Sequence, residues 1–211
     1  MIDERLLNAV PTIAHWRLAD VPKHLNVEHV QRLLSCFDGS TAAGCRDQAM
    51  ALCMVEMGLR AAEVASIRLE DIDWRRSILR IHETKSGRER LLPLPRRPGC
   101  AIARYLRRSR PLTSERSLFV RHRKLPGSAL TPELVRGAMR RAYARAGFPL
   151  EWCGTHILRH TAATRMLQRG ATLKEIADVL GHRSINTSAI YAKVDLSALK
   201  TVALPWPESK A

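Results

Sequence analysis

The chain has 211 residues, of which 45% are hydrophobic and only 5% aromatic. This length and apolar content suit one folded domain and exclude extensive disorder, and the core must consist mainly of aliphatic side chains and Met. The 35 Lys and Arg residues against 20 Asp and Glu give a formal charge of +15. This surplus favours a polyanionic partner such as nucleic acid, although a solvated basic surface or a membrane-associated protein has the same charge.

The five cysteines are odd in number and form no CxxC pair, which argues against a disulfide framework and against a zinc ribbon. We expect small buried thiols in a reducing cytosol. No apolar run approaches the length that spans a bilayer, and no leader pattern opens the chain. We therefore expect a cytoplasmic, DNA-associated bacterial protein with no membrane partner.

In chain order, residues 1–25 show little periodicity, which predicts an arm or a linker remnant. Asn26 is a plausible N-cap for a helix whose apolar positions fall on one face. A second helix is predicted over about residues 44–57. Gly58 ends this helix and places Arg60 at the start of another short helix.

Residues 78–82 and 89–95 predict two strands, and Thr84-Lys85-Ser86-Gly87 between them has the turn chemistry of a hairpin. Two prolines near the end of the second strand place it at a sheet edge, because proline cannot donate to a ladder. Residues 118–120 predict a third strand.

The rest of the chain is predicted to be helical, over about residues 99–108, 131–146, 155–169, 173–180 and a short piece near Tyr191. Thr131-Pro132-Glu133 supplies cap and first-turn signals, and Thr172 with Glu175 forms a capping-box pattern. The sequence therefore predicts an α+β fold that is mostly α-helical, with one domain over residues 26–211 and a small antiparallel sheet.

A set of basic residues and one tyrosine has the makings of a phosphoryl-transfer site, namely Arg60, Lys85, His156, Arg159, His182 and Tyr191. Breaking a DNA strand requires neutralised non-bridging oxygens, an in-line nucleophile and a proton for the leaving oxygen. Arginine suits the first task because its planar fork binds two phosphate oxygens and stays charged. A tyrosine hydroxyl can serve as the nucleophile.

These residues stand in four boxes that resemble those of the tyrosine recombinases, the phage-integrase family. The segment from Gly58 to Val64, followed by Asp71-Ile72-Asp73, is similar to the family's first arginine box, and the segment from Thr84 to Arg88 to its lysine-bearing hairpin. Thr155 to Thr161 resembles the His-x-x-Arg box, and Leu180-Gly181-His182 with Tyr191 resembles the terminal box. Spacings of three, twenty-three and nine residues from His156 to Tyr191 fit the family, and the resemblance covers about residues 26–200.

The resemblance implies a catalytic domain that cuts DNA through a 3′-phosphotyrosine without metal, ATP or another cofactor. Tyr191 would attack the phosphate, and Lys85 would protonate the leaving 5′ oxygen. Arg60 and Arg159 would clamp the non-bridging oxygens. The set is completed by a hydrogen-bond donor to the phosphate, His182, and by a proton acceptor for the tyrosine or a further phosphate contact, His156.

Two supporting residues are expected beside this set. Glu63 stands one helical turn beyond Arg60 and would orient side chains. His160 is interpreted as a buried residue behind the site. His156 and His160 also have the i,i+4 spacing of a zinc pair, but no Glu follows His156 and no third ligand is evident, so we expect no metal.

Three further groups of cations are candidate contacts to the phosphates of double-stranded DNA, with a solvated surface as the alternative for each. They are Arg104, Arg107, Arg108 and Arg110; Arg121, Arg123 and Lys124; and Arg136, Arg140, Arg141 and Arg145.

Most relatives carry an N-terminal helical domain that forms the other half of a clamp around DNA, and residues 1–25 are too few for it. We expect a catalytic fragment, a truncated product or a small member similar to the fimbrial invertases, with weak DNA binding on its own. Residues 195–200 predict a short tail helix. In the family such a tail docks on a neighbouring protomer, which implies a homo-tetramer on DNA; a tail folded on its own domain is the alternative.

The sequence thus predicts a site-specific recombinase acting in integration, excision or inversion. A type IB topoisomerase shares the tyrosine chemistry but relaxes supercoils. A DNA-binding regulator that has kept the fold without activity is the alternative from another class, because residues 155–180 also resemble a helix-turn-helix.

Overall fold

The computed structural model describes residues 22–82, 89–152, 154–182 and 191. Its helices are α2 (Val27–Ser35), α3 (Ala42–Met57), α4 (Ala61–Ser66), α5 (Arg96–Arg108), α6 (Pro132–Arg145), α7 (Thr155–Gln168) and α8 (Leu173–Leu180). The strands are β1 (Ile72–Asp73), β2 (Ile78–His82) and β3 (Glu89–Pro93), with short 3₁₀ turns at Leu69–Asp71 and Leu150–Trp152. The predicted mostly helical α+β fold is confirmed.

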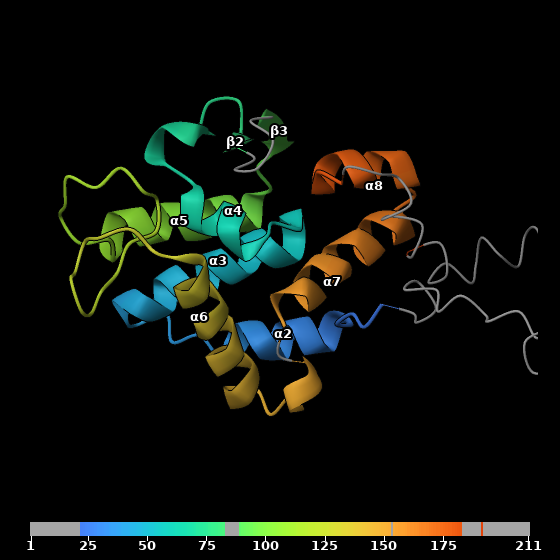
Figure 1. Ribbon diagram of the computed structural model, residues 1–211, viewed down its shortest axis with the longest axis horizontal. Helices are drawn as coiled ribbons and strands as arrows, with labels where there is room; N and C mark the ends of the chain where they lie inside the picture. Colours follow the sequence, from blue (N-terminus) through green and yellow to red (C-terminus); the bar gives the residue numbers. More distant parts are fainter. Residues whose placement is uncertain (1–21, 83–88, 153, 183–190, 192–211) are drawn as a thin grey trace, which may run out of the picture.

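Helix α3 is the central element of the fold. Most of its residues are buried, because it is apolar around nearly its whole circumference, as expected of a helix surrounded by protein. It packs against α5 and α7 most extensively, and also against α2, α4 and α6. In Figure 1 the sheet lies above this helical body, and α7 and α8 form its right-hand side. One end of α3 therefore approaches α7 and α8.

Polar caps set the helix boundaries much as the sequence indicates. The Asn26 side chain accepts a hydrogen bond from the His29 amide (2.7 Å), and Thr131 caps α6, where Pro132 fills the first position. Thr172 and Glu175 form the predicted capping box at the start of α8. Glycines in the left-handed conformation end α3 and α8, at Gly58 (φ 68°) and Gly181 (φ 63°).

The sheet is antiparallel in the order β1-β2-β3, with Leu79 opposite Leu92. Strand β3 is an edge strand, as its prolines predict. The prediction of a strand at residues 118–120 is wrong, since the third strand is β1. These residues are buried, but they make only isolated bridges, and the amide of Leu118 donates to the Ile67 carbonyl (2.8 Å) rather than into a ladder.

Two predicted boundaries shift by several residues. Strand β3 ends at Pro93, and α5 begins at Arg96 instead of residue 99, because a proline at position 98 is tolerated in a first helical turn, where amides lack helical partners anyway. The expected arm up to residue 21, the Thr84–Gly87 turn and the tail helix at 195–200 lie outside the described residues. Within the described ranges, no helix is long and apolar enough to cross a membrane.

Candidate active site

Arg60 and Glu63 form a closed pair at the start of α4. Arg60 is the N-cap residue, and its amide donates to Glu63 Oε2 (2.7 Å) while its Nη1 donates to Glu63 Oε1 (2.9 Å). Its Nη2 reaches the Gly181 carbonyl at 3.3 Å. The Glu63 side chain is buried, whereas that of Arg60 is 40% exposed. Arg60 is therefore held in place and still open to a ligand.

Arg159 joins the C-terminal ends of two helices. It extends from α7, donates from Nη1 to the Gly58 carbonyl (2.7 Å) and from Nη2 to the Leu180 carbonyl. Carbonyls at helix ends lack helical partners and carry partial negative charge, so a guanidinium suits them. Burial and the neighbouring charge of Arg60 lower the pKa of Arg159 to about 10, which leaves it cationic at neutral pH. Two of its five N–H groups are used here, and three remain for a ligand.

Tyr191 is buried beside these arginines. It packs on Ala163, Ile176 and Leu180, and its hydroxyl lies 2.9 Å from His160 Nδ1. Burial raises the pKa of the Tyr191 phenol, and the charges of Arg159 and Arg60 oppose that rise. The phenol is therefore protonated at neutral pH, so its use as a nucleophile requires a proton acceptor.

The histidines differ in their surroundings. Burial, followed by repulsion from Arg159 and Arg60, lowers the pKa of His182 to about 4. Burial and the neighbouring His156 lower the pKa of His160 to about 4 as well. Both rings are neutral at pH 7. His156 is exposed, with its ring centroid 5.8 Å from that of His160.

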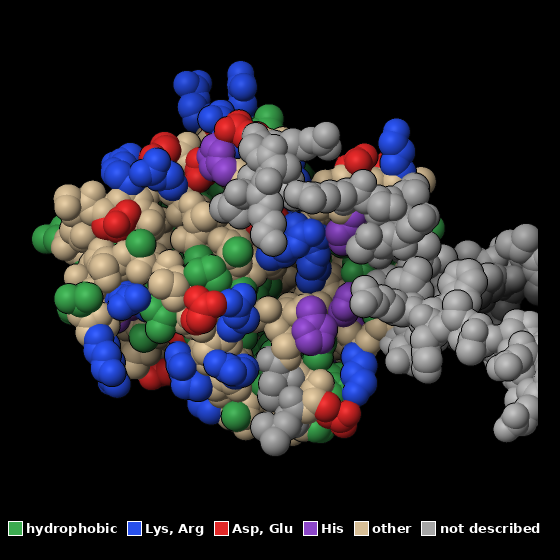
Figure 2. Space-filling model, in the orientation of Figure 1, with side chains coloured by type: hydrophobic (Ala, Val, Ile, Leu, Met, Phe, Trp, Pro, Cys, Tyr) green, Lys and Arg blue, Asp and Glu red, His purple; other side chains and the backbone are tan. Residues whose placement is uncertain are grey.

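The structure thus brings together Arg60, Arg159, His160, His182 and Tyr191, with Glu63 behind Arg60. His160 is only partly buried, and it is His160, not His156, that contacts the tyrosine hydroxyl. Lys85 lies outside the described residues. Figure 2 shows histidine and arginine side chains gathered on one face of the molecule. Among the described residues, no group of three His, Cys, Asp or Glu could hold a metal ion.

Sequence reasoning missed Arg90 on β3. Its Nη2 donates to Glu63 Oε1 (2.9 Å) and its Nε to the Val179 carbonyl (3.0 Å), and its side chain is only 15% exposed. A charged residue on an edge strand is usually solvated, and alternation along the strand gives no hint of a partner on α4 or α8. The single available signal was its place five residues after Lys85.

The candidate DNA contacts have different surroundings. Most of them are exposed, namely Arg104, Arg107, Arg108, Arg123, Lys124, Arg136, Arg140, Arg141 and Arg145. Arg104 bonds to Gln48 and Arg136 pairs with Glu133. Grouping Arg110 with them was wrong, because its guanidinium donates to three carbonyls of residues 115, 117 and 118 and fixes the loop after α5.

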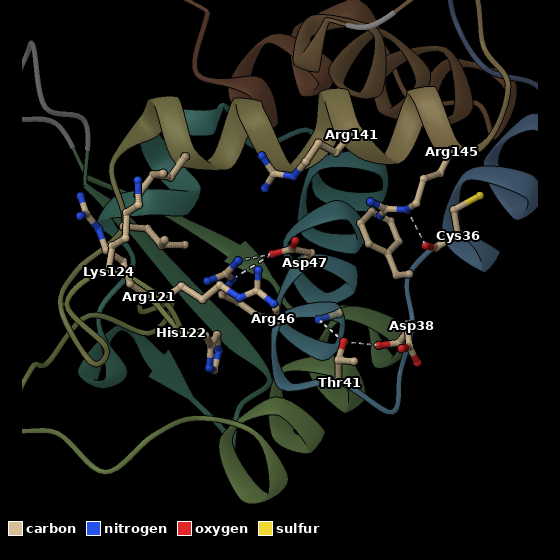
Figure 3. Close-up of a pocket in the computed structure, with 16 residues that line it drawn as sticks. Cys36, Asp38, Thr41, Arg46, Asp47, Arg121, His122, Lys124, Arg141 and Arg145 are labelled. Carbon is tan, nitrogen blue, oxygen red and sulfur yellow. Dashed lines mark hydrogen bonds and ion pairs between the residues drawn. The ribbon is translucent and has the colours of Figure 1, made fainter.

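A second basic cavity of about 690 Å³ lies at the N-terminal end of α3 (Figure 3). Arg121, Arg123 and Lys124 line it from one loop, and Arg141 and Arg145 line it from α6. Arg46 and Asp47 face it as a buried ion pair, with 2.7 Å between Arg46 Nη2 and Asp47 Oδ1. Two of the predicted cation clusters therefore converge on one cavity.

Comparison with known proteins identifies the family. The model of the phage integrase family matches residues 23–197, close to the span expected from the motifs. The chain belongs to the phage integrase family. The resemblance read from the four motif boxes is confirmed.

Two relatives from Sinorhizobium fredii illustrate the range of lengths in the family. The putative integrase/recombinase y4rA is 45% identical over 206 residues, which cover 98% of this chain and 50% of that protein. The putative integrase/recombinase y4gC is 40% identical over 176 residues, 83% of this chain and 90% of that protein. The chain spans about half the length of y4rA and of a second Sinorhizobium relative.

Solved structures agree with this assignment. The fold is similar to the XerH site-specific recombinase bound to its difH substrate after cleavage, with a TM-score of 0.73 and 26% identity over 86% of this chain and 52% of that one. The XerA recombinase crystal structure gives a TM-score of 0.72 at 25% identity, over 86% of this chain and 64% of that one. The family's catalytic fold is therefore present in this chain.

Proposed function

We propose that this chain is the catalytic part of a site-specific recombinase that cuts and rejoins double-stranded DNA through a 3′-phosphotyrosine. The observation that carries the proposal is the convergence of two arginines and two neutral histidines on the buried Tyr191 hydroxyl. Membership of the phage integrase family and the likeness to DNA-bound XerH support it.

In the proposed reaction, the Tyr191 oxygen forms a bond to the scissile phosphorus as the bond to the 5′ oxygen breaks. The phenolic proton passes to His160, which lies at hydrogen-bond distance and is neutral at pH 7. Lys85 gives a proton to the departing 5′ oxygen. His156 is exposed beside His160 and has room to contact the phosphate. The ester retains the energy of the broken bond, so rejoining needs no ATP.

The arginines supply the electrostatic part of this mechanism. Arg60 is partly exposed, and Arg159 has three N–H groups in excess of its two carbonyl contacts, so the two forks can bind both non-bridging oxygens. His182, neutral at pH 7, adds a hydrogen bond to the phosphate. Because the helix ends hold Arg159 before DNA binds, little reorganisation accompanies the reaction. No step in this scheme requires a metal.

The basic cavity at the other end of α3 is a second place for the DNA backbone. Helix α3 has 16 residues, and a rise of ~1.5 Å per residue separates its ends by about 24 Å. A duplex held at Tyr191 must therefore extend several base pairs to reach Arg123 and Lys124. Neutralising both with glutamine should lower the slope of log affinity against log salt by about 0.9 per lost contact. Arg76→Gln, an exposed cation on the β1–β2 turn, is the control and should leave the slope unchanged.

Assembly into a tetramer through the tail, as in the family, completes the proposal. A topoisomerase-like activity remains the second candidate, and it predicts relaxation of plasmids that lack a specific site. A recombinase instead exchanges strands only between matched sites. Binding without any covalent step would assign the chain to the regulators.

The decisive experiment uses a nicked suicide substrate that carries the attachment site of the element from which the chain derives. The expected result is a covalent adduct that survives denaturation, forms in EDTA and is absent in Tyr191→Phe. An adduct that persists in Tyr191→Phe would refute the nucleophile, and dependence on a divalent ion would refute the metal-free reaction. Cleavage by Arg159→Lys should be at least 100-fold slower, because one ammonium cannot bond to both the Gly58 and Leu180 carbonyls and the phosphate.

A further inference from the structure

Arg90 closes a ring of polar contacts around the end of α8. Starting from Glu63 Oε1, the ring passes through Arg90 to the Val179 carbonyl, along the backbone to Gly181, and from the Gly181 carbonyl through Arg60 back to Glu63. Three elements that are far apart in the sequence, β3, α4 and α8, meet in this ring.

We propose that Arg90 is a positioning residue for the DNA-cleavage reaction, which places Arg60 through Glu63 and places His182 through the end of α8. This inference rests on the proposed function, because it concerns the same site. Arg90 itself touches neither Tyr191 nor any catalytic side chain directly in the contacts found for the described residues, so its effect passes through the carboxylate and the helix end.

The contact with Glu63 shows how Arg60 depends on Arg90. One oxygen, Glu63 Oε1, accepts from both Arg60 Nη1 and Arg90 Nη2 at 2.9 Å, while the other oxygen accepts the Arg60 amide. Arg90 therefore fixes the position of the atom that orients the Arg60 fork. Because the Glu63 side chain is buried, water cannot easily replace a lost partner.

The contact with α8 shows how His182 depends on Arg90. The Nε bond to the Val179 carbonyl anchors the last turn of α8, two residues before Gly181. A Cβ built on Gly181 would lie 2.8 Å from Arg90 Nη1, so the guanidinium packs directly against this glycine. The left-handed turn at Gly181 then sets where His182 leaves the helix.

Arg90 also contributes to the charge of the site. Three arginines, Arg60, Arg90 and Arg159, surround one carboxylate, Glu63, which leaves a net charge of +2 for a phosphodiester. The charge of Arg90 acts with those of Arg159 and Arg60 and with His160, after burial, to lower the pKa of His182. Removing Arg90 should therefore raise that pKa, while also releasing the helix end.

Lysine cannot replace Arg90 in this role. The guanidinium uses two different nitrogens, Nε and Nη2, for two partners on opposite sides, whereas an ammonium is one point charge on a flexible stem. A residue needed only for positive potential would tolerate lysine. A residue needed for position would not.

The test compares Arg90→Lys and Arg90→Gln with the control Arg80→Gln, an exposed arginine on the neighbouring strand β2. Single-turnover cleavage of the suicide substrate at saturating protein separates the rate constant from DNA affinity, and thermal unfolding monitors folding. We expect both Arg90 variants to cleave about 10- to 100-fold more slowly while DNA affinity changes little. Arg80→Gln should cleave like the unmodified chain. Wild-type cleavage by folded Arg90→Lys would overturn the inference.

An NMR titration of the histidine side chains provides a readout that needs no activity. In the unmodified chain, His182 should titrate near pH 4, and in Arg90→Gln it should titrate at higher pH. An unmoved His182 pKa together with an unmoved cleavage rate refutes the role of Arg90 and leaves the proposed function intact. If the unmodified chain forms no adduct but the His182 pKa moves in Arg90→Gln, the proposed function fails and the placement of His182 by Arg90 stands.

Discussion

Gly58 is the residue on which two helix ends and the catalytic arginine meet, and Gly58→Ala tests that packing. Gly58 has a φ of 68°, and an added Cβ would lie 2.3 Å from Leu180 Cδ2 and 3.4 Å from Ala162 Cβ. The left-handed backbone costs a residue with a Cβ about 1–2 kcal/mol, and overpacking a core costs about 1–3 kcal/mol. We expect Gly58→Ala to lower the free energy of unfolding by about 2–5 kcal/mol.

Gly147→Ala is the matched control for the conformational part of this cost. Gly147 has nearly the same φ, 67°, and an added Cβ there meets no atom within 4 Å. Its substitution should cost only the backbone share, about 1–2 kcal/mol. Urea unfolding of both variants at one temperature gives the two free energies, and their difference isolates the steric contact with Leu180.

The same pair of variants reports on the site. Displacing Leu180 moves the carbonyl that binds Arg159 and the neighbouring Gly181 carbonyl that binds Arg60. Single-turnover cleavage by folded Gly58→Ala should fall by about 100-fold, as a shift of ~1 Å in a catalytic group is enough for this. Equal stability and equal cleavage in Gly58→Ala and Gly147→Ala would refute the close packing of α8 on Gly58.

Two further outcomes follow from the charges of the site. The pKa values of His160 and His182 are lowered to about 4, below 6.5 for an unfolded histidine, so the unfolded chain binds more protons between these values. Stability should therefore be complete above about pH 6.5 and fall as the pH drops to 4, and urea midpoints should show a shallower loss in His182→Gln; an identical pH dependence in that variant would contradict the shift. Glu63→Gln should cost about 2–4 kcal/mol and slow cleavage, because three charge-assisted bonds are lost or weakened, whereas Glu28→Gln on the exposed face of α2 should change stability by less than ~0.5 kcal/mol. Equal urea midpoints for these two glutamine variants would contradict the role of Glu63.

Local signals were sufficient for most of the secondary structure. Caps such as Asn26 and Thr172 act within three residues of themselves, so their effect can be read from the sequence. The buried segment 118–120 misled because an apolar β-prone run indicates burial but not a pairing partner. Whether such a run joins a sheet depends on which chain passes beside it, and here that neighbour is Ile67, not a strand.

The site divides in the same way. The motif spacing named Arg60, Arg159 and Tyr191, and the structure places them together, although their chemical roles remain predictions. The structural partners of the arginines could not be predicted, because Arg159 binds backbone carbonyls, and every residue carries one. Arg90 and Arg110 show the reverse problem, since arginines of similar sequence context lie in a polar ring in one case and in a structural loop in the other.

The way Arg159 is held has a consequence for biosynthesis. Its two carbonyl partners belong to Gly58, one hundred and one residues earlier, and Leu180, twenty-one residues later. Translation at about 5–20 residues per second leaves roughly 5–25 seconds between the emergence of Arg60 and that of α8. During this interval a basic nascent chain can already touch nucleic acid, but its arginines have no fixed positions. The capacity to break DNA therefore arises only when the last described helix docks, which protects the genome from incomplete copies of the protein.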